Sequence, residues 1–472
     1  MTPTTIPDVA IVGSGPSGGR VAWDLVQAGA SCLLLEAGDE FTARPGRGAK
    51  PFPGNERDYS TQLFWGGGIE LSSDARVAFL RARCLGGTSI VNQALMDRFD
   101  DIALDDWRSR SGIDFLSVDG LAGDYDAVEA DLDIQVIPTE HHNRNTRIFT
   151  EAFEARGFGW TALRRAQGDC ALDRGTDCIA CLGGCVRESK QSSLVTTIRR
   201  SRERGLDVEC GVEVLRVEEL ADRVRLHVRR GRILDSVEAR TVVLAAGALG
   251  TTGVLLRSNL RETLPALGQG FACHPQVMSY ALFDEPVDAH KGAFQAVKSQ
   301  DAALRAQGLK FENVFAPPIG TSMLLPGRGR ELQRTMGRYR HMASMEVAIR
   351  DDAVGTISLD RRGQLRIDKR LTSADRSKVS RGLDHVEELF ASAGAGDVIR
   401  CTDTFGLHLM GGCAIGTDAK TSVVGPDFRV HGTQRVFAAD SSVFPSAPGI
   451  NPSLTVMALS HRARTSVAEA AA

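Results

Sequence analysis

The 472-residue sequence lacks the features that mark several large classes of protein. No apolar run approaches the roughly 18 residues of a membrane-spanning helix, and residues 1–7 are neither basic nor long enough for a secretory signal. Its 56 basic and 59 acidic side chains leave a net charge of −3 without a basic cluster, so no nucleic-acid partner is expected. We therefore expect a cytoplasmic protein without a membrane span.

Cysteine is also sparse for a chain of this length. Ten cysteines in 472 residues are too few for a disulfide scaffold, and in a reducing compartment they would remain thiols or bind a metal. The remaining composition, 42% hydrophobic and 24% charged, is that of an ordinary globular protein. The length allows two or more domains.

The N-terminal region has the pattern of a dinucleotide-binding β-α-β unit. An apolar run at 9–12 is followed by Gly13-Ser-Gly15-Pro-Ser-Gly18, a helix-like stretch at 20–27, and a second apolar run at 32–35 that ends at Glu36. The three glycines suit a tight turn, close approach of a pyrophosphate, and close packing of helix on strand, in that order. A carboxylate at the end of the second strand can accept both ribose hydroxyls.

Further along the chain the character changes several times. Residues 41–68 are rich in Pro and Gly and predict loop, 208–228 alternate as strands do, 241–246 form an apolar strand, and 276–399 predict a separate sheet domain. A strand at 436–439 and a helix at 452–470 close the chain. The fold class expected is α/β, or α+β overall: a discontinuous Rossmann-like domain that binds the dinucleotide and a substrate domain built on an antiparallel sheet. We predict the dinucleotide-binding domain at 1–120, 190–275 and 430–472, and the substrate-binding domain, which includes the cysteine-rich segment 170–185, at 121–189 and 276–429.

Four separated segments resemble the glucose–methanol–choline (GMC) oxidoreductases. They are Leu33-Leu-Leu-Glu-Ala-Gly38, Leu85-Gly-Gly-Thr-Ser-Ile-Val-Asn92, Gly247-Ala-Leu-Gly-Thr-Thr-Gly-Val-Leu-Leu256 with Thr252 where proline is commoner, and the block 408–460. The resemblance implies an FAD-dependent enzyme that oxidises an alcohol carbon by hydride transfer to flavin N5.

The resemblance also implies cofactor contacts. The predicted FAD-binding residues are Gly13, Gly15 and Gly18 at the pyrophosphate, Glu36 at the ribose, Val214 at the adenine, Gly87, Thr88 and Asn92 along the flavin, Asp440 at the ribityl or phosphate region, and Pro452 at the start of a helix aimed at the flavin. Each glycine could equally serve a plain turn, and Val214 an ordinary core strand. Some relatives attach the flavin through a histidine where this chain has Ile90 and Val91, so we expect non-covalent FAD.

Two residues match the family's catalytic pair. Loss of the hydroxyl proton needs a base, and a neutral imidazole is available near pH 7. His408 occupies the position of the family's histidine, and Asn451 that of its partner, whose amide N–H could donate to the substrate oxygen. Asn451 followed by Pro452 also matches a helix N-cap with proline at the first helical position. His274 lies in a segment that resembles one near the family's domain boundary, and we expect it to be structural.

Four cysteines are clustered, at Cys170, Cys178, Cys181 and Cys185. An iron–sulfur cluster, zinc, and unmetallated thiols or a disulfide are all compatible with this spacing. With a cluster the protein would pass electrons to a carrier; otherwise oxygen is the alternative acceptor. Sugars, glycosides, aminoglycoside-type sugars and other polyols are expected as substrates in preference to long-chain alcohols, because the sequence has no hydrophobic membrane-docking segment. A non-redox lyase on the same scaffold and an electron-relay subunit are the competing functions.

Overall fold

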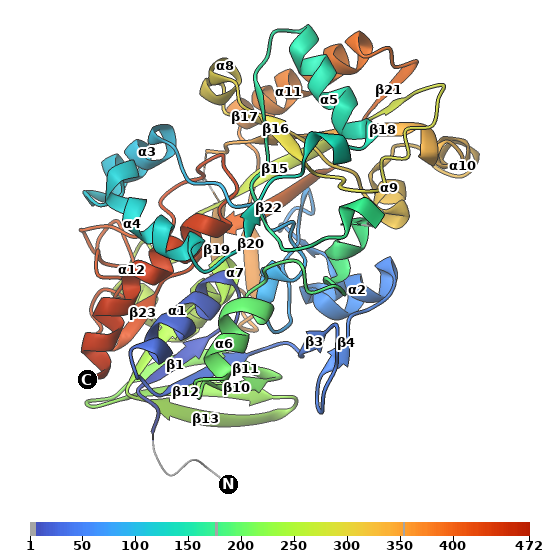
Figure 1. Cartoon of the computed structure of the whole chain (residues 1–472). Helices are drawn as coiled ribbons and strands as arrows, with labels where there is room; N and C mark the ends of the chain where they lie inside the picture. Colours follow the sequence, from blue (N-terminus) through green and yellow to red (C-terminus); the bar gives the residue numbers. More distant parts are fainter. Residues whose placement is uncertain (1–5, 175–177, 353–354) are drawn as a thin grey trace.

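The computed structural model describes residues 6–174, 178–352 and 355–472, and two β-sheets dominate it (Figure 1). The parallel sheet lies in the half of the molecule that also holds both chain ends, and the larger sheet forms the other half (Figure 1). One hydrophobic core surrounds the parallel sheet and extends to Phe79, Phe271 and Met410 of the larger sheet, and a second packs around the rest of the larger sheet. Among the described residues, no helix is long and apolar enough to cross a membrane.

The parallel sheet has five strands, nearly all of them buried. Their spatial order is β10 (Asp207–Cys210), β2 (Cys32–Glu36), β1 (Val9–Val12), β14 (Thr241–Leu244) and β23 (Val436–Ala438). Apolar runs of this kind suit a sheet that is covered on both faces. Val12 pairs with both Leu35 and Leu244, so the carboxyl ends of β2, β1 and β14 meet at one edge. In open α/β sheets this is the edge where ligands bind.

Helices and a small antiparallel sheet cover these strands. The covering elements are α1 (Pro16–Gln27), α4 (Val118–Glu129), α7 (Gly247–Arg257), α12 (Ser453–Ala471), β11 (Val212–Glu219), β12 (Val224–Arg230) and β13 (Ile233–Ala239). α1 packs against α12, and α12 against α4, so that the first and last helices of the chain lie side by side.

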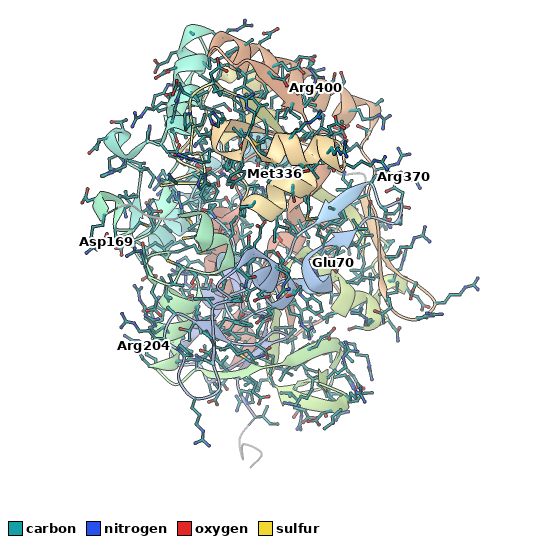
Figure 2. The ribbon with its side chains drawn as sticks, turned by 90° about the vertical axis from the view of Figure 1, so that its right-hand side faces the viewer. Glu70, Asp169, Arg204, Met336, Arg370 and Arg400 are labelled. Atoms are coloured by element: carbon teal, nitrogen blue, oxygen red, sulfur yellow. The ribbon has the colours of Figure 1, made fainter. Side chains whose placement is uncertain are left out.

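The larger sheet is antiparallel except where β22 pairs with β6. Its main order is β5 (Glu70–Leu71), β6 (Val77–Phe79), β22 (Thr404–Met410), β15 (Gln269–Leu282), β18 (Met342–Ile349), β17 (Leu309–Asn313), β16 (Val297–Ser299) and β8 (Trp160–Ala162), with β19 (Gly355–Leu359), β20 (Leu365–Asp368) and β21 (Asp397–Arg400) paired beside it. α5 (Arg144–Ala155) and α11 (Ser373–Ser392) pack against β18. Arg400 on β21 and Arg204 mark opposite ends of the molecule, with Glu70 on β5 between them (Figure 2).

Shorter elements connect these layers. They are α2 (Glu56–Leu63), α3 (Asp101–Ser111), α6 (Arg199–Arg202), α8 (Ala302–Ala306), α9 (Pro318–Leu324), α10 (Arg330–Met336), β3 (Phe41–Thr42), β4 (Lys50–Pro51), β7 (Ile134–Gln135) and β9 (Arg165–Ala166).

The α/β class with a Rossmann-like unit and an antiparallel sheet is confirmed, and β1, α1 and β2 lie where the pattern predicted them. Several helices inside these predicted regions were missed, among them α2 and α11. α2 lies inside the predicted loop 41–68, where the Asn55 side chain accepts the Asp58 N–H and caps it. α11 lies inside the predicted strand region, where Thr372 and Asp375 form a capping box.

The division into two domains at the stated boundaries stays a prediction. Two segments assigned to the FAD-binding part, β5 with β6 and the start of β15, belong to the larger sheet. α4, assigned largely to the substrate part, packs on α12. The sequence pattern did not show that these segments pack with the other predicted domain, because they contain charged residues and glycine.

Candidate active site

The first glycine turn sits at the carboxyl end of β1. Gly13 has a φ of +96°, which only glycine adopts without strain, and a Cβ at Gly18 would lie 1.9 Å from the Gly13 carbonyl oxygen. At Gly15, by contrast, an added Cβ would meet no described atom within 4 Å. Gly15 is also the residue before α1, whose first N–H groups need acceptors from outside the helix. This backbone is therefore open to an anionic ligand.

Glu36 ends β2 beside this turn and is buried. Its Oε2 accepts from the Ser14 hydroxyl at 2.6 Å and the Ser14 N–H at 3.2 Å, and its Oε1 from the Gly38 N–H at 2.8 Å. Burial raises the pKa of this carboxyl, while the hydrogen bonds from Ser14 and Gly38 oppose that effect. The carboxyl group predicted to contact the ribose is thus anchored by the turn after β1 and by the segment after β2.

The second glycine segment packs directly on the first. A Cβ added at Gly87 would lie 2.7 Å from Gly15 Cα, so the two turns touch. Thr88 is exposed at this point, whereas Ile90 and Val91 are buried. Asn92 Oδ1 accepts the Ala94 N–H at 3.0 Å, which fixes that side chain locally. The segment lies where a cofactor held by Gly15 would continue.

Asp440 follows β23 and is buried at the same edge of the parallel sheet. Its Oδ2 accepts from the Gly247 N–H at 2.8 Å and the Thr251 hydroxyl at 2.5 Å, and its Oδ1 from the Ser442 N–H at 2.8 Å. Burial raises the pKa of this carboxyl, and its hydrogen bonds with Ser442 and Thr251 counteract the rise. Val214 lies apart from it, as a buried side chain of β11.

His408 sits on a β-bulge in β22. Ala272 of β15 pairs with Met410 and His274 with Leu407, so two residues of β22 face one of β15. His408 has a φ of +57°, an uncommon conformation for a residue other than glycine. The bulge changes the direction of this side chain relative to the strand. Desolvation and the nearby Lys310 ammonium lower the pKa of His408 to about 3.

His274 was expected to be structural and away from the catalytic face, but it contacts His408. The two Nδ1 atoms are 2.9 Å apart, and His274 Nε2 accepts the Gly449 N–H at 2.9 Å. A backbone N–H can only donate, so a neutral His274 carries its proton on Nδ1 and donates it to His408. A neutral His408 then carries its own proton on Nε2. Burial, followed by the His408 charge, lowers the pKa of His274 well below its usual value.

Asn451 is buried but does not cap α12, because the helix begins one residue later than predicted, with Pro452 at the cap position. Its Nδ2 donates to Asp97 Oδ2 at 2.9 Å and to Glu312 Oε1 at 3.0 Å, and its Oδ1 accepts from Lys310 Nζ at 2.7 Å. Both amide hydrogens are therefore occupied in this arrangement. The predicted donation to a substrate oxygen would require one of these bonds to open.

An ionic cluster around Asn451 was missed from the sequence. It consists of Asp97, Lys298, Lys310, Glu312 and Glu346. Lys298 pairs with Asp97, and Lys310 with Glu312 at 2.7 Å. The only available signal was the i, i+2 spacing of Lys310 and Glu312, which puts both on one face of a strand. Their partners come from distant parts of the chain.

The cysteine-rich segment lies beside the stretch that is predicted to line the flavin. Buried Lys190 donates from Nζ to the carbonyl oxygens of Ile90, Asn92 and Cys181. Asp169, which precedes Cys170, lies at the outer edge of the molecule (Figure 2). The side chain of Cys178 lies outside the described residues, and those described contain no group of three metal-ligating side chains. The four-cysteine metal site therefore gains no support.

These residues fit FAD. The open backbone at Gly15 with the start of α1 suits a pyrophosphate, the Glu36 carboxyl lies at the end of β2, and the exposed Thr88 extends the surface toward the larger sheet. The fold and this site define a flavoprotein with a dinucleotide-binding half and a second half that carries two contacting histidines.

Comparison with known proteins identifies the family. Sequence models of the GMC oxidoreductases match residues 60–276 and 351–460. An uncharacterized GMC-type oxidoreductase of Mycobacterium tuberculosis is 30% identical over 96% of this chain and 75% of its own length. A second, from Sinorhizobium fredii, is 30% identical over 98% of this chain and 94% of its own length. A long-chain-alcohol oxidase of Arabidopsis thaliana is 23% identical over 96% of this chain and 66% of its own length.

Solved structures share the fold. Pyridoxine 4-oxidase from Mesorbium loti has a TM-score of 0.75 at 17% identity, covering 97% of this chain and 98% of its own. A fungal aryl-alcohol oxidase has a TM-score of 0.67 at 16% identity, and the match covers 98% of this chain and 99% of the oxidase chain. The chain belongs to the GMC oxidoreductase family and is an FAD-dependent alcohol oxidoreductase.

Proposed function

We propose that this enzyme oxidises a CH–OH group of a sugar or other polyol to a carbonyl. FAD, when bound, accepts the hydride that leaves the substrate carbon. The observation that carries the proposal is His408, a partly exposed imidazole whose lowered pKa keeps it neutral at pH 7. The charged and polar groups of the ionic cluster beside it suit a substrate with several hydroxyls better than an alkyl chain.

We assign proton removal to His408, and the Gly449 N–H sets a condition on this role. In the resting tautomers His408 Nε2 carries a proton, so it donates rather than accepts. To free Nε2, His408 must carry its proton on Nδ1. His274 must then carry its proton on Nε2 and release the Gly449 N–H. The base role therefore requires a tautomer exchange in the histidine pair.

Two substitutions of His408 distinguish a role as general base from a role as hydrogen-bond donor. His408→Gln retains an N–H donor but cannot accept the proton, whereas His408→Ala lacks both functions. We expect both variants to retain FAD and both to slow anaerobic flavin reduction by at least about 100-fold in stopped-flow measurements. Near-normal reduction by His408→Gln would reassign His408 as a donor.

A panel of sugars, polyols and simple alcohols tests the reaction class. Anaerobic mixing should bleach the flavin absorbance with at least one polyol. Relatives named as alcohol oxidases support oxidation of a CH–OH group in general. If no alcohol bleaches the flavin, oxidation is excluded for the panel and a non-redox lyase becomes the better assignment.

We further propose non-covalent FAD, because Ile90 and Val91 offer no side-chain nitrogen for a flavin link. Acid precipitation should release all of the flavin into the supernatant. The electrons would then pass to oxygen or to a carrier, and peroxide formation during turnover distinguishes the two. Iron and acid-labile sulfide assays, on the wild type and Cys181→Ser, decide whether an iron–sulfur cluster takes part.

A further inference from the structure

A row of charged side chains crosses three strands of the larger sheet. Lys298 on β16 pairs in register with Glu312 on β17, and Glu312 with Glu346 on β18. Residues directly opposite on neighbouring strands share a face and have Cβ atoms about 5 Å apart. Asn451 donates to Glu312, so this face borders the loop that carries the predicted catalytic asparagine.

Most of the hydrogen-bonding capacity in this row is used within the protein. Glu312 accepts from Lys310 and Asn451 at Oε1, and from Gln295 at Oε2 at 2.6 Å. Lys298 pairs with Asp97. The two ammonium groups therefore balance the Asp97 and Glu312 carboxylates.

Glu346 is the exception. It is 7% exposed, yet within the described part of the chain it accepts no hydrogen bond and forms no ion pair. Its cross-strand neighbours are Glu312, which is also a carboxylate, and Met278. Burial, followed by the Glu312 charge, raises the pKa of Glu346 to about 8, although the Lys310 ammonium partly opposes the rise.

A buried carboxyl group without a partner, opposite a like charge, destabilises the folded chain. Native proteins keep such groups mainly where a ligand or a reaction uses them. The position of Glu346, one strand away from the partner of Asn451, indicates a ligand that enters the active site and brings a hydrogen-bond donor.

We propose that Glu346, with Glu312 beside it, binds a primary ammonium group of the substrate, so that the enzyme oxidises an amino sugar or another amine-bearing polyol. This inference rests on the proposed function, with the oxidised hydroxyl near His408 and the amine at β18. An ammonium supplies three N–H donors and the positive charge that the row lacks when Glu346 is ionised. A neutral alkyl chain would leave the carboxyl unsatisfied.

A quaternary ammonium is a poorer match. It has no N–H to donate, and proteins commonly hold such groups in cages of aromatic rings. The neighbours of Glu346 in the row are Glu312 and Met278, neither of them aromatic. The site should therefore distinguish a primary amine from its trimethylated counterpart.

The test compares matched ligands on the FAD-loaded enzyme at pH 7. Glucosamine, glucose, N-acetylglucosamine and choline are titrated by calorimetry, and flavin bleaching is followed with each. We expect glucosamine to bind at least about tenfold more tightly than the other three, since a hydrogen bond to a charged group is worth that factor or more. Equal or tighter binding of glucose, N-acetylglucosamine or choline overturns the inference.

Variants assign the effect to one carboxyl group. Glu346→Gln should remove the preference for glucosamine while FAD content stays unchanged, and Glu285→Gln, an exposed carboxyl elsewhere, should retain it. A preference that survives in Glu346→Gln also overturns the inference. Because binding is measured apart from bleaching, an absence of bleaching contradicts only the oxidation proposal, whereas equal binding contradicts only the amine site.

Discussion

The hydrogen bond from the Gly449 N–H to His274 Nε2 determines which ring nitrogen carries the proton in both His274 and His408. Since both rings are held neutral, His408 and His274 differ from ordinary surface histidines in the pH range where they affect stability. The sequence motif around His408 identified the residue but contained no information on its partner. His274 is 134 positions away, and only the β15–β22 pairing brings it into contact.

The lowered pKa of His408 predicts acid sensitivity. The folded protein titrates this ring near 3 and the unfolded chain near 6.5, so between these values only the unfolded chain binds the proton. The stability that comes from the neutral ring is complete above pH 6.5 and is lost as the pH falls toward 3. Between pH 7 and pH 5 the wild type should lose about 2 kcal/mol more than His408→Asn in urea unfolding. Equal losses would contradict the lowered pKa.

The raised pKa of Glu346 predicts a stability that falls as the pH rises, which is opposite to the effect of His408. Its pKa is about 8 in the folded protein and near 4.5 in the unfolded chain, so the folded chain retains a proton that the unfolded chain releases. This contribution is complete below pH 4.5 and is lost as the pH rises toward 8. Relative to the wild type, Glu346→Gln should therefore gain more than about 2 kcal/mol of stability from pH 5 to pH 8. Urea unfolding at the two pH values measures the gain, with Glu285→Gln as the unchanged control.

At the scale of elements, local pattern was sufficient for the β1–α1–β2 unit. Two apolar runs, three spaced glycines and a terminal carboxylate all lie within about 30 residues, so the periodicity and the turn residues agree. The bulge in β22, by contrast, could not be predicted from local pattern. Alternation along 404–410 is compatible with a regular strand, and the extra residue that turns His408 becomes visible only when β15 is placed beside it.

The turn before α1 makes a prediction that separates cofactor binding from folding. A methyl group at Gly15 meets no described atom, so Gly15→Ala should leave the melting temperature of the FAD-free protein nearly unchanged. The same methyl would occupy the space that a pyrophosphate needs, and FAD affinity should fall at least about tenfold. Equilibrium dialysis measures this. Gly123→Ala in α4, which also meets open space, is the matched control and should bind FAD normally.

At the scale of the whole molecule, the ionic cluster was beyond prediction from sequence. Its members come from residues 97, 298, 310–312, 346 and 451, on a loop, three strands and the approach to α12. Asp97 follows Met96 of one hydrophobic core and Lys298 follows Val297 of the other, and no short motif records such a contact. Family resemblance predicted the two halves of the candidate site separately, and only the three-dimensional arrangement shows which residues lie between them.

Cofactor removal should lower the stability of the whole chain. A ligand that binds only the folded state at 100 times its dissociation constant contributes about 2.7 kcal/mol. The FAD-free enzyme should therefore melt at a lower temperature, and added FAD should restore the difference. Gly15→Ala should show a much smaller FAD-dependent shift in the same scan. An equal shift in that variant would place the cofactor elsewhere.

The strand order of the parallel sheet has a consequence for how the protein is made. β1 and β2 leave the ribosome first, yet β23 comes from residues 436–438 and α12, which packs on α1, from 453–471. Domains tend to fold as units during synthesis, N-terminal ones first. Here the N-terminal strands must wait for nearly the whole chain before their sheet is complete. The larger sheet, whose last strand ends at Met410, is fully synthesised earlier, so the half that binds the cofactor is the last to be completed.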